Sequence, residues 1–340
     1  MIELSVHLPD LNDIVLALAI SLYFLAVCAA VSIPWLAAHL EFWGIQEGYK
    51  SYQVAASRLS ETAVYNLGAA FLFGLLSFLL ASMRTPNKLF TASVLLAPGL
   101  GFFLIFLAGY VGLIFLYRHG WKWSGKFHRV HVWIGVSAGV LASFCVAFLV
   151  ALIIGVSDVS LWPILRIDSW SVFREADFLF GWLFAFLTVF LTGGIVVMLV
   201  SRDAFRWESG SSLSEGARLI RLGAFFSLCA IFLMVILSVV WVLFRGLGPF
   251  QPVVFSDRPE LIPLAVIAFA GMVALVEILM SALKRRGSAP RASIFAAVFL
   301  FLAVFGMTSI LSWKQGLPKR EGGNVSVFSQ EKPQLGNAPR

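Results

Sequence analysis

Eight apolar stretches of about 20 residues or more constrain the fold more than any other feature of the sequence. They lie at residues 12–40, 63–83, 92–117, 131–156, 178–200, 219–244, 261–283 and 292–313. Each is long enough to cross the hydrocarbon core of a bilayer as a helix. Backbone polar groups cannot stay unpaired in lipid, and the alternation typical of a barrel is missing. The sequence therefore predicts an all-α, polytopic membrane bundle of about eight transmembrane helices, as its 60% hydrophobic and 13% charged residues also indicate.

The loops between these stretches carry most of the charge and indicate how the chain is oriented. The net charge is +7, and Lys and Arg concentrate in the first, third, fifth and seventh loops. In membrane proteins the cytoplasmic loops carry the excess of Lys and Arg. We therefore expect a multi-pass membrane protein with both termini outside the cytoplasm, which is the periplasmic side for the expected location in a bacterial inner membrane. Because these charges are topology signals, we expect no nucleic-acid partner.

The last part of the chain has a different composition. Residues 314–340 are rich in Gly, Pro, Gln, Asn and charge, a composition that cannot bury a core. We expect a transmembrane helical domain at 1–313 and a disordered polar tail at 314–340. The cysteines Cys28, Cys145 and Cys229 lie inside apolar stretches without a CxxC pair, so neither a disulfide nor a metal site is expected.

Two polar residues inside apolar stretches are candidates for function. Glu277 lies in "MVALVEILMSALKRR", about two helical turns before Lys284. An ionisable group in a span is expensive, so Glu277 either serves a proton path, pairs with a neighbouring helix or reaches the lipid headgroups. Asn66, in "AVYNLGAAF", is a candidate for a hydrogen bond between helices. We find no motif of a hydrolase or of a nucleotide-binding protein in a usable context.

Two histidines lie close together where the fourth apolar stretch begins. In "GKFHRVHVWIG", His128 and His131 are three residues apart and lie beside Lys126 and Arg129. Residues at this spacing share one face of a helix, so the pair is a candidate for haem ligation. The alternative is a basic rim that marks the cytoplasmic end of the helix.

Several segments of the chain share an ordered set of motifs with one family. A tyrosine-containing loop precedes the second stretch in "GYKSYQVAASRLSETAVYNLGAAF" (48–71), and "YVGLIFL" (110–116) precedes the histidine that begins the fourth. The segment "WSVFREADFLFGWLFAFLTVFLTGG" (170–194) begins with Trp and ends in Thr-Gly-Gly. In this order the chain resembles subunit I of the cytochrome bd-type quinol oxidases over about residues 11–245.

The resemblance implies a haem-binding scaffold, but the family's ligand positions differ here. The position of the haem b histidine in the family's first helix is matched by Tyr23. A ligating glutamate of the third helix falls at Pro98 and Gly99, and the histidine of the fifth helix falls at Ala185. Met272 is the candidate for the family's methionine ligand, although the surrounding motif is absent. The family resemblance therefore suggests that haem binds, but the residues of this chain at the family's ligand positions do not support it.

The resemblance also changes which interpretation of His128 and His131 is favoured. His131 matches a family histidine at the same helix start that is not an axial haem ligand, and His128 has no clear counterpart. Both remain candidate ligands, with the rim interpretation favoured.

The sequence thus favours a bd-oxidase-subunit-I-like membrane subunit of a respiratory electron-transfer complex, acting as a scaffold or carrying little haem. Its activity as a quinol:oxygen oxidoreductase stays open because the catalytic ligands are not evident. The partners expected are the lipid bilayer, other membrane subunits and a cytochrome c, and binding of quinol is left open. The alternative is a transporter or a proton-conducting subunit without a redox cofactor, which would use Glu277.

Overall fold

Helices make up almost all of the chain that the structure describes. The computed structural model describes residues 11–84, 86–157, 161–207, 213–244, 261–284 and 289–316. The helices are α1 (Leu11–Gln46), α2 (Lys50–Arg84), α3 (Pro86–Leu95), α4 (Ala97–Gly120), α5 (Ser124–Ser157), α6 (Trp162–Ile167), the short 3₁₀-helix η2 (Ser171–Arg174), α7 (Ala176–Trp207), α8 (Leu213–Phe244), α10 (Leu261–Lys284) and α11 (Ala289–Gly316). No strand occurs in these ranges.

The predicted all-α membrane bundle is confirmed. Helices α1, α2, α4, α5, α7 and α8 are each long and apolar enough to cross a membrane. Helices α10 and α11 occupy the last two predicted stretches, and α11 contains an apolar segment at Arg291–Gly306. The expected number of eight spans is therefore approximate, because six helices in the described part of the chain meet the full criterion.

Several helix boundaries differ from the predicted stretches. Helix α1 continues past residue 40 to Gln46 and α2 begins at Lys50, because polar residues extend both helices beyond the apolar core. The tight turn between them uses Gly48 with a φ of 72°, a conformation that glycine adopts without steric cost. Helix α11 runs to Gly316, into the segment expected to be a tail, and residues 317–340 lie outside the described ranges.

The predicted stretch 92–117 is divided between two helices. Helix α3 ends at Leu95 and α4 begins at Ala97, with Leu96 between them. Pro98 lies in the first turn of α4, where the missing proline N–H costs no hydrogen bond. Pro98 cannot donate to the carbonyl oxygen of Val94, four residues earlier, so a continuous helix is interrupted there.

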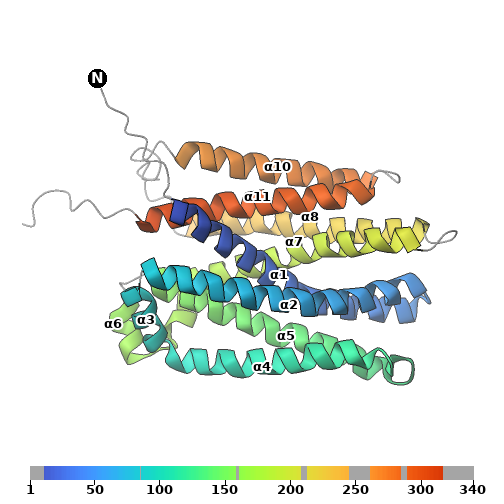
Figure 1. The fold of residues 1–340 in the computed structure, drawn as a ribbon, viewed down its shortest axis with the longest axis horizontal. Helices are drawn as coiled ribbons and strands as arrows, with labels where there is room; N and C mark the ends of the chain where they lie inside the picture. The colour runs from blue at the N-terminus through green and yellow to red at the C-terminus, as the bar shows by residue number, and fades with distance from the viewer. Residues whose placement is uncertain are drawn as a thin grey trace, which may run out of the picture.

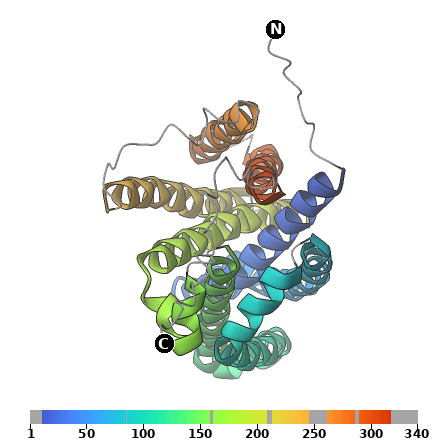
Figure 2. The same ribbon diagram turned by 90° about the vertical axis from the view of Figure 1, so that its left-hand side faces the viewer.

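The long helices form two groups of four that meet along α1 and α7. Helices α1, α2, α4 and α5 contact one another in the first group, and α7, α8, α10 and α11 do so in the second. Figure 1 shows the long helices side by side, with α4 and α5 at one edge and α10 at the other. Figure 2 views the same arrangement end-on, with α1 crossing between the groups. Helix α1 contacts α2, α5, α7 and α11, so it is the central helix of the fold.

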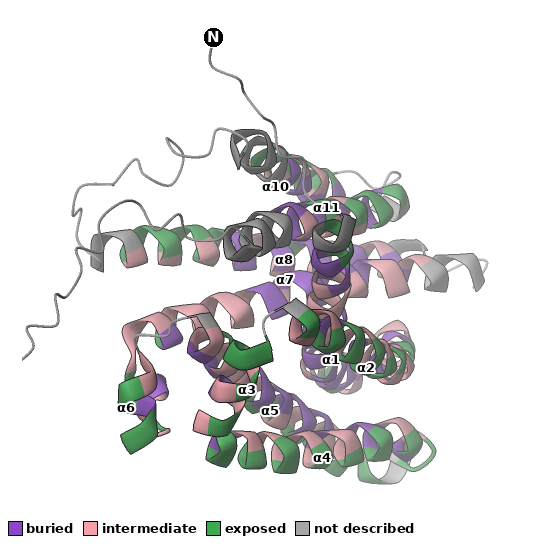
Figure 3. Ribbon diagram, turned by 60° about the vertical axis from the view of Figure 1, so that its left-hand side comes forward, coloured by how far each residue is buried: buried purple, intermediate pink, exposed green. Residues whose placement is uncertain are grey.

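Each group has its own hydrophobic core. One core joins α1, α2, α4 and α5 through buried residues such as Leu59 and Ile114, and it also includes Val189 and Val197 of α7 and Leu219 of α8. The other joins α7, α8, α10 and α11 through residues such as Met198 and Leu275. Buried residues lie where helices face one another and exposed apolar residues lie on the outer sides (Figure 3). An apolar outer surface is expected of a bundle that lipid surrounds.

Glycines allow the closest approach between helices. A Cβ atom on Gly194 of α7 would lie 2.4 Å from the carbonyl oxygen of Gly223 in α8 and 2.3 Å from the hydroxyl oxygen of Ser227. Because apolar helices gain no hydrophobic energy from association in lipid, close van der Waals packing at small residues supplies the attraction. Within the Thr-Gly-Gly at the end of the sequence motif, Gly194 therefore serves the α7–α8 contact, whereas Gly193 lies against Ser32 and Leu36 of α1.

Helix α1 contains a proline whose missing hydrogen bond is replaced from another helix. Pro34 has no N–H, so the carbonyl oxygen of Ala30 lacks its ordinary helical donor. The buried hydroxyl of Tyr110, from α4, donates to that oxygen at 2.6 Å. This contact satisfies the backbone at a depth where water is absent.

Candidate functional site

Three side chains from three helices form a buried polar network in the first group. Glu41 comes from α1, Tyr117 from α4 and His131 from α5, and their exposed fractions are 1%, 0% and 3%. His131 Nδ1 lies 2.7 Å from Glu41 Oε1, and the Tyr117 hydroxyl donates to Glu41 Oε2 at 2.9 Å. His131 Nε2 donates to the Tyr117 carbonyl oxygen at 2.7 Å. We call these three residues the Glu–Tyr–His cluster.

The helix ends bring the cluster together. Glu41 lies in the last turns of α1, Tyr117 in the last turn of α4 and His131 early in α5. Gly120 ends α4 and leaves room for the imidazole, since a Cβ there would lie 2.6 Å from His131 Cδ2. Gly135 of α5 lets the helices approach, because its Cβ would lie 2.9 Å from Tyr117 Cε2.

Aromatic rings and one hydroxyl enclose the cluster. The Tyr117 ring stacks on the His131 ring with centroids 4.4 Å apart, and the Trp121 ring packs edge-on at 4.8 Å. Trp121 Nε1 donates to the Ser60 hydroxyl of α2 at 3.1 Å. The cluster and its surroundings therefore connect all four helices of the first group.

The hydrogen bonds fix how many protons the Glu41–His131 pair holds. A backbone carbonyl only accepts, so His131 Nε2 carries a proton. At 2.7 Å, Nδ1 and Oε1 need one proton between them, because two lone pairs would repel. The pair is therefore neutral as a whole, as imidazolium with carboxylate or as imidazole with carboxylic acid.

This arrangement can do two things. The Glu41–His131 pair can bind a proton, and the hydrogen bonds of the cluster can hold α1, α4 and α5 together. A buried pair with all its hydrogen bonds made holds three helices in one geometry, and removing either partner would leave the other without its hydrogen bond. The Tyr117 hydroxyl is buried and donates to the Glu41 carboxylate, so in this arrangement it is a structural hydrogen-bond donor.

The sequence predictions identified one of the three members. His131 belongs to the cluster, whereas His128 is half-buried and lies outside it, after the non-helical Phe127. Both ring nitrogens of His131 are engaged by Glu41 and Tyr117, which leaves none to ligate a metal in this arrangement. Sequence reasoning missed Glu41 because the predicted span ended at residue 40. An acidic residue in "LAAHLEFWG" was the signal that could have revealed it.

The other candidate residues lie apart from the cluster. Asn66 of α2 donates from Nδ2 to the Thr62 carbonyl oxygen of its own helix at 2.9 Å. Met272 of α10 is half-buried against the core of the second group. Glu277, also on α10, is exposed at the outer surface of that group. The predicted roles of these residues stay predictions, and the structure brings none of them to the Glu–Tyr–His cluster.

The positions at which the family binds haem are filled by side chains of the bundle. Tyr23 packs its ring over Gly74 of α2, where a Cβ would lie 2.8 Å from Tyr23 Cε2. At Gly99 the ring of Phe148 lies 3.5 Å from the place of a Cβ, and Ala185 packs against the core of the first group. The three positions matched to the family's ligands thus contribute to helix packing, and haem binding by this chain stays a prediction. Within the described ranges, no group of three or more His, Cys, Asp or Glu residues could hold a metal ion.

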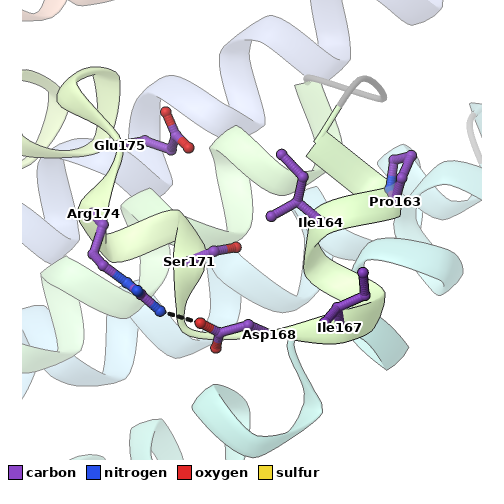
Figure 4. A pocket seen from close by; sticks show the side chains of 7 residues that line it. All are labelled: Pro163, Ile164, Ile167, Asp168, Ser171, Arg174 and Glu175. Atoms are coloured by element: carbon purple, nitrogen blue, oxygen red, sulfur yellow. Dashed lines mark hydrogen bonds and ion pairs between the residues drawn. The ribbon is translucent and has the colours of Figure 1, made fainter.

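A surface pocket lies at the opposite end of the bundle, between α6, η2 and the beginning of α7. It has a volume of about 450 Å³ and is lined by Pro163, Ile164, Ile167, Asp168, Ser171, Arg174 and Glu175 (Figure 4). Arg174 pairs with Asp168, which also accepts a hydrogen bond of 2.9 Å from the Trp170 amide. Besides this ion pair, the polar groups of the lining are the Ser171 hydroxyl and the Glu175 carboxylate.

Comparison with known proteins identifies a similar fold. The sequence matches no protein-family model and no curated protein. Among solved structures, the chain is similar to one described as the bd oxidase from Geobacillus thermodenitrificans, with a TM-score of 0.64 and 13% identity. The match covers 90% of this chain and 85% of that chain. The predicted resemblance is thus supported at the level of the fold, and assignment to subunit I stays a prediction.

Proposed function

We propose that this chain is a membrane subunit of a bd-type respiratory electron-transfer complex, in which it serves as a scaffold and not as the site of oxygen reduction. The observation that carries this proposal is the fold similarity to the bd oxidase structure over 90% of the chain. A membrane bundle of this kind has an extended apolar surface for lipid and for further membrane subunits.

The packing at the family's ligand positions supports the scaffold role. Oxygen reduction requires a redox cofactor, because side chains cannot carry that chemistry. Tyr23, Gly99 and Ala185 are committed to helix packing and do not offer the family's ligands. The chain's own residues instead contribute the Glu–Tyr–His cluster, which fixes α1, α4 and α5 against one another.

The experiment compares the chain in its complex with the chain alone. Gentle extraction from the membranes of the source organism, followed by native electrophoresis, is expected to give a complex larger than this chain with the absorbance of haem. The purified chain alone is expected to show no Soret band and no oxygen uptake with a reduced quinol. Cyanide-insensitive oxygen uptake by the chain alone would contradict the scaffold role, and migration without partners would contradict membership in a complex.

The alternative of a transporter or proton-conducting subunit draws on Glu277. A proton path needs ionisable groups that line the interior of a bundle or a water-filled cavity. The exposed position of Glu277 on α10 provides less support for such a path than an interior position would. Solute or proton uptake by a colourless chain reconstituted in vesicles would favour the alternative.

A further inference from the structure

One face of α10 carries a glutamate in the middle of an exposed apolar stripe. Exposed residues recur on this helix at intervals of three and four positions, the spacing of a single helix face. They include Phe269, Val273, Glu277, Met280, Ser281 and Lys284, which we call the α10 stripe. The opposite face is buried, where α10 packs against α8 and α11. In Figures 1 and 2, α10 lies at the outer edge of the second group.

Helix α10 packs alongside α8 and α11, so the carboxylate of Glu277 is expected to lie within the depth of the membrane. It precedes Lys284, at the end of α10, by two helical turns, a rise of roughly 10 Å. Side chains on a helix lean toward its N-terminus, so Glu277 points away from the headgroups near Lys284. The other end of α10, at Leu261, is farther away still. A carboxylate that faces hydrocarbon at this depth is strongly unfavourable unless another group pairs with it.

We propose that the α10 stripe is the binding surface for a transmembrane helix of a partner subunit, which places a basic or hydrogen-bond-donating side chain opposite Glu277. The inference rests on the proposed membership in a membrane complex and adds the surface and the chemistry of one contact. Charge complementarity selects the partner, because a donor at the depth of Glu277 removes the cost of the exposed carboxylate.

A second copy of this chain does not meet that requirement. All copies insert with the same orientation, so a two-fold contact of the α10 stripe with itself places Glu277 beside Glu277 at the same depth. Two carboxylates at this separation repel, and Lys284 lies two turns away in both copies. A symmetric contact between two copies is therefore unfavourable, and the partner of this proposal is a different chain.

The test places a photo-crosslinking amino acid at Phe269 or at Met280 in the full chain, expressed in the membranes of the source organism. A matched control carries the same amino acid at Phe71, which is exposed on α2 away from any embedded carboxylate. Crosslinking from each position is measured with the native Glu277, with Glu277→Gln and with Glu277→Leu. Native electrophoresis of the same membranes reports whether the chain remains in a complex.

The expected result is one protein adduct of defined mass from both α10 positions and none of that mass from Phe71. Mass spectrometry should place the crosslink in a membrane-spanning segment of another chain that has a basic or amide side chain nearby. Glu277→Leu should reduce its yield on the order of fivefold, the effect of losing one hydrogen bond between membrane helices, while Glu277→Gln retains most of it.

Three results would overturn the inference. Adducts with lipid alone, an adduct with a second copy of the chain, or a yield that is unchanged in Glu277→Leu each exclude the proposed contact. If native electrophoresis still shows the complex, only the contact at α10 fails and the proposed function stands. If the chain migrates alone, both fail.

Discussion

The Tyr110 hydroxyl of α4 donates a hydrogen bond of 2.6 Å to the carbonyl oxygen of Ala30 in α1. This oxygen is the one that Pro34 leaves without a helical donor. The two helices are thereby joined at a point where α1 could not satisfy its own backbone.

Replacing Tyr110 by Phe is expected to destabilise the fold by about 1–2 kcal/mol, because a buried carbonyl oxygen loses its partner. Pro34→Ala restores an N–H four residues after Ala30, so Tyr110→Phe should cost less in that background. Thermal unfolding of the four proteins in detergent measures the coupling between these residues. Equal costs in both backgrounds would show that the hydroxyl does not substitute for the missing amide.

The Glu–Tyr–His cluster predicts different results for the two neighbouring histidines. His131→Ala and Glu41→Ala should each cost about 1–3 kcal/mol, because each leaves a buried hydrogen-bonding partner unsatisfied. Glu41→Gln should cost less, since its amide can donate to a neutral imidazole and still accept from Tyr117. His128→Ala should stay within about 0.5 kcal/mol, as is usual at sites without such partners.

Melting curves and haem spectra of these variants distinguish a role of the cluster in holding the helices together from haem ligation by His128 and His131. A stability loss confined to the cluster supports its role in holding the helices. Loss of bound haem in both His128→Ala and His131→Ala, with unchanged melting temperature, would instead support ligation by the histidine pair.

The α7–α8 contact predicts a strong difference between two glycine substitutions. In Gly194→Ala the new methyl group would meet the Gly223 carbonyl oxygen and the Ser227 hydroxyl, and overpacking of this kind costs about 1–3 kcal/mol. Gly112→Ala, in α4, has open space around the new methyl group and should cause no loss. Denaturation of both variants under the same detergent conditions tests the contact, and equal stability would contradict it.

The distribution of Lys and Arg predicts the orientation in the membrane. Helices α1, α4, α7 and α10 end, and α2, α5, α8 and α11 begin, at one end of the bundle (Figure 1). This end carries Lys50, Lys122 and Lys284 and is expected to face the cytoplasm. A reporter that is active only in the cytoplasm should therefore function when inserted near Lys122. A signal only from a periplasmic reporter at that place would reverse the predicted topology.

The sequence determined the class of the fold because the requirement for internal hydrogen bonding in lipid is local. Length and apolar composition were enough to predict the helices, since a helix satisfies its backbone within its own segment. The break before α4 also had a local cause in Pro98, although the uninterrupted apolar stretch concealed it.

The tertiary structure alone decided which polar residues meet. In a soluble helix, a polar face distinguishes the surface from the core, but a membrane helix is apolar toward both lipid and protein. The sequence therefore could not show that Glu41 would face His131, 90 positions later, or that Glu277 would face outward. Those directions follow from how α1 packs among its neighbours and how α10 packs on α8 and α11, because only interhelical packing sets the rotation of each helix about its axis.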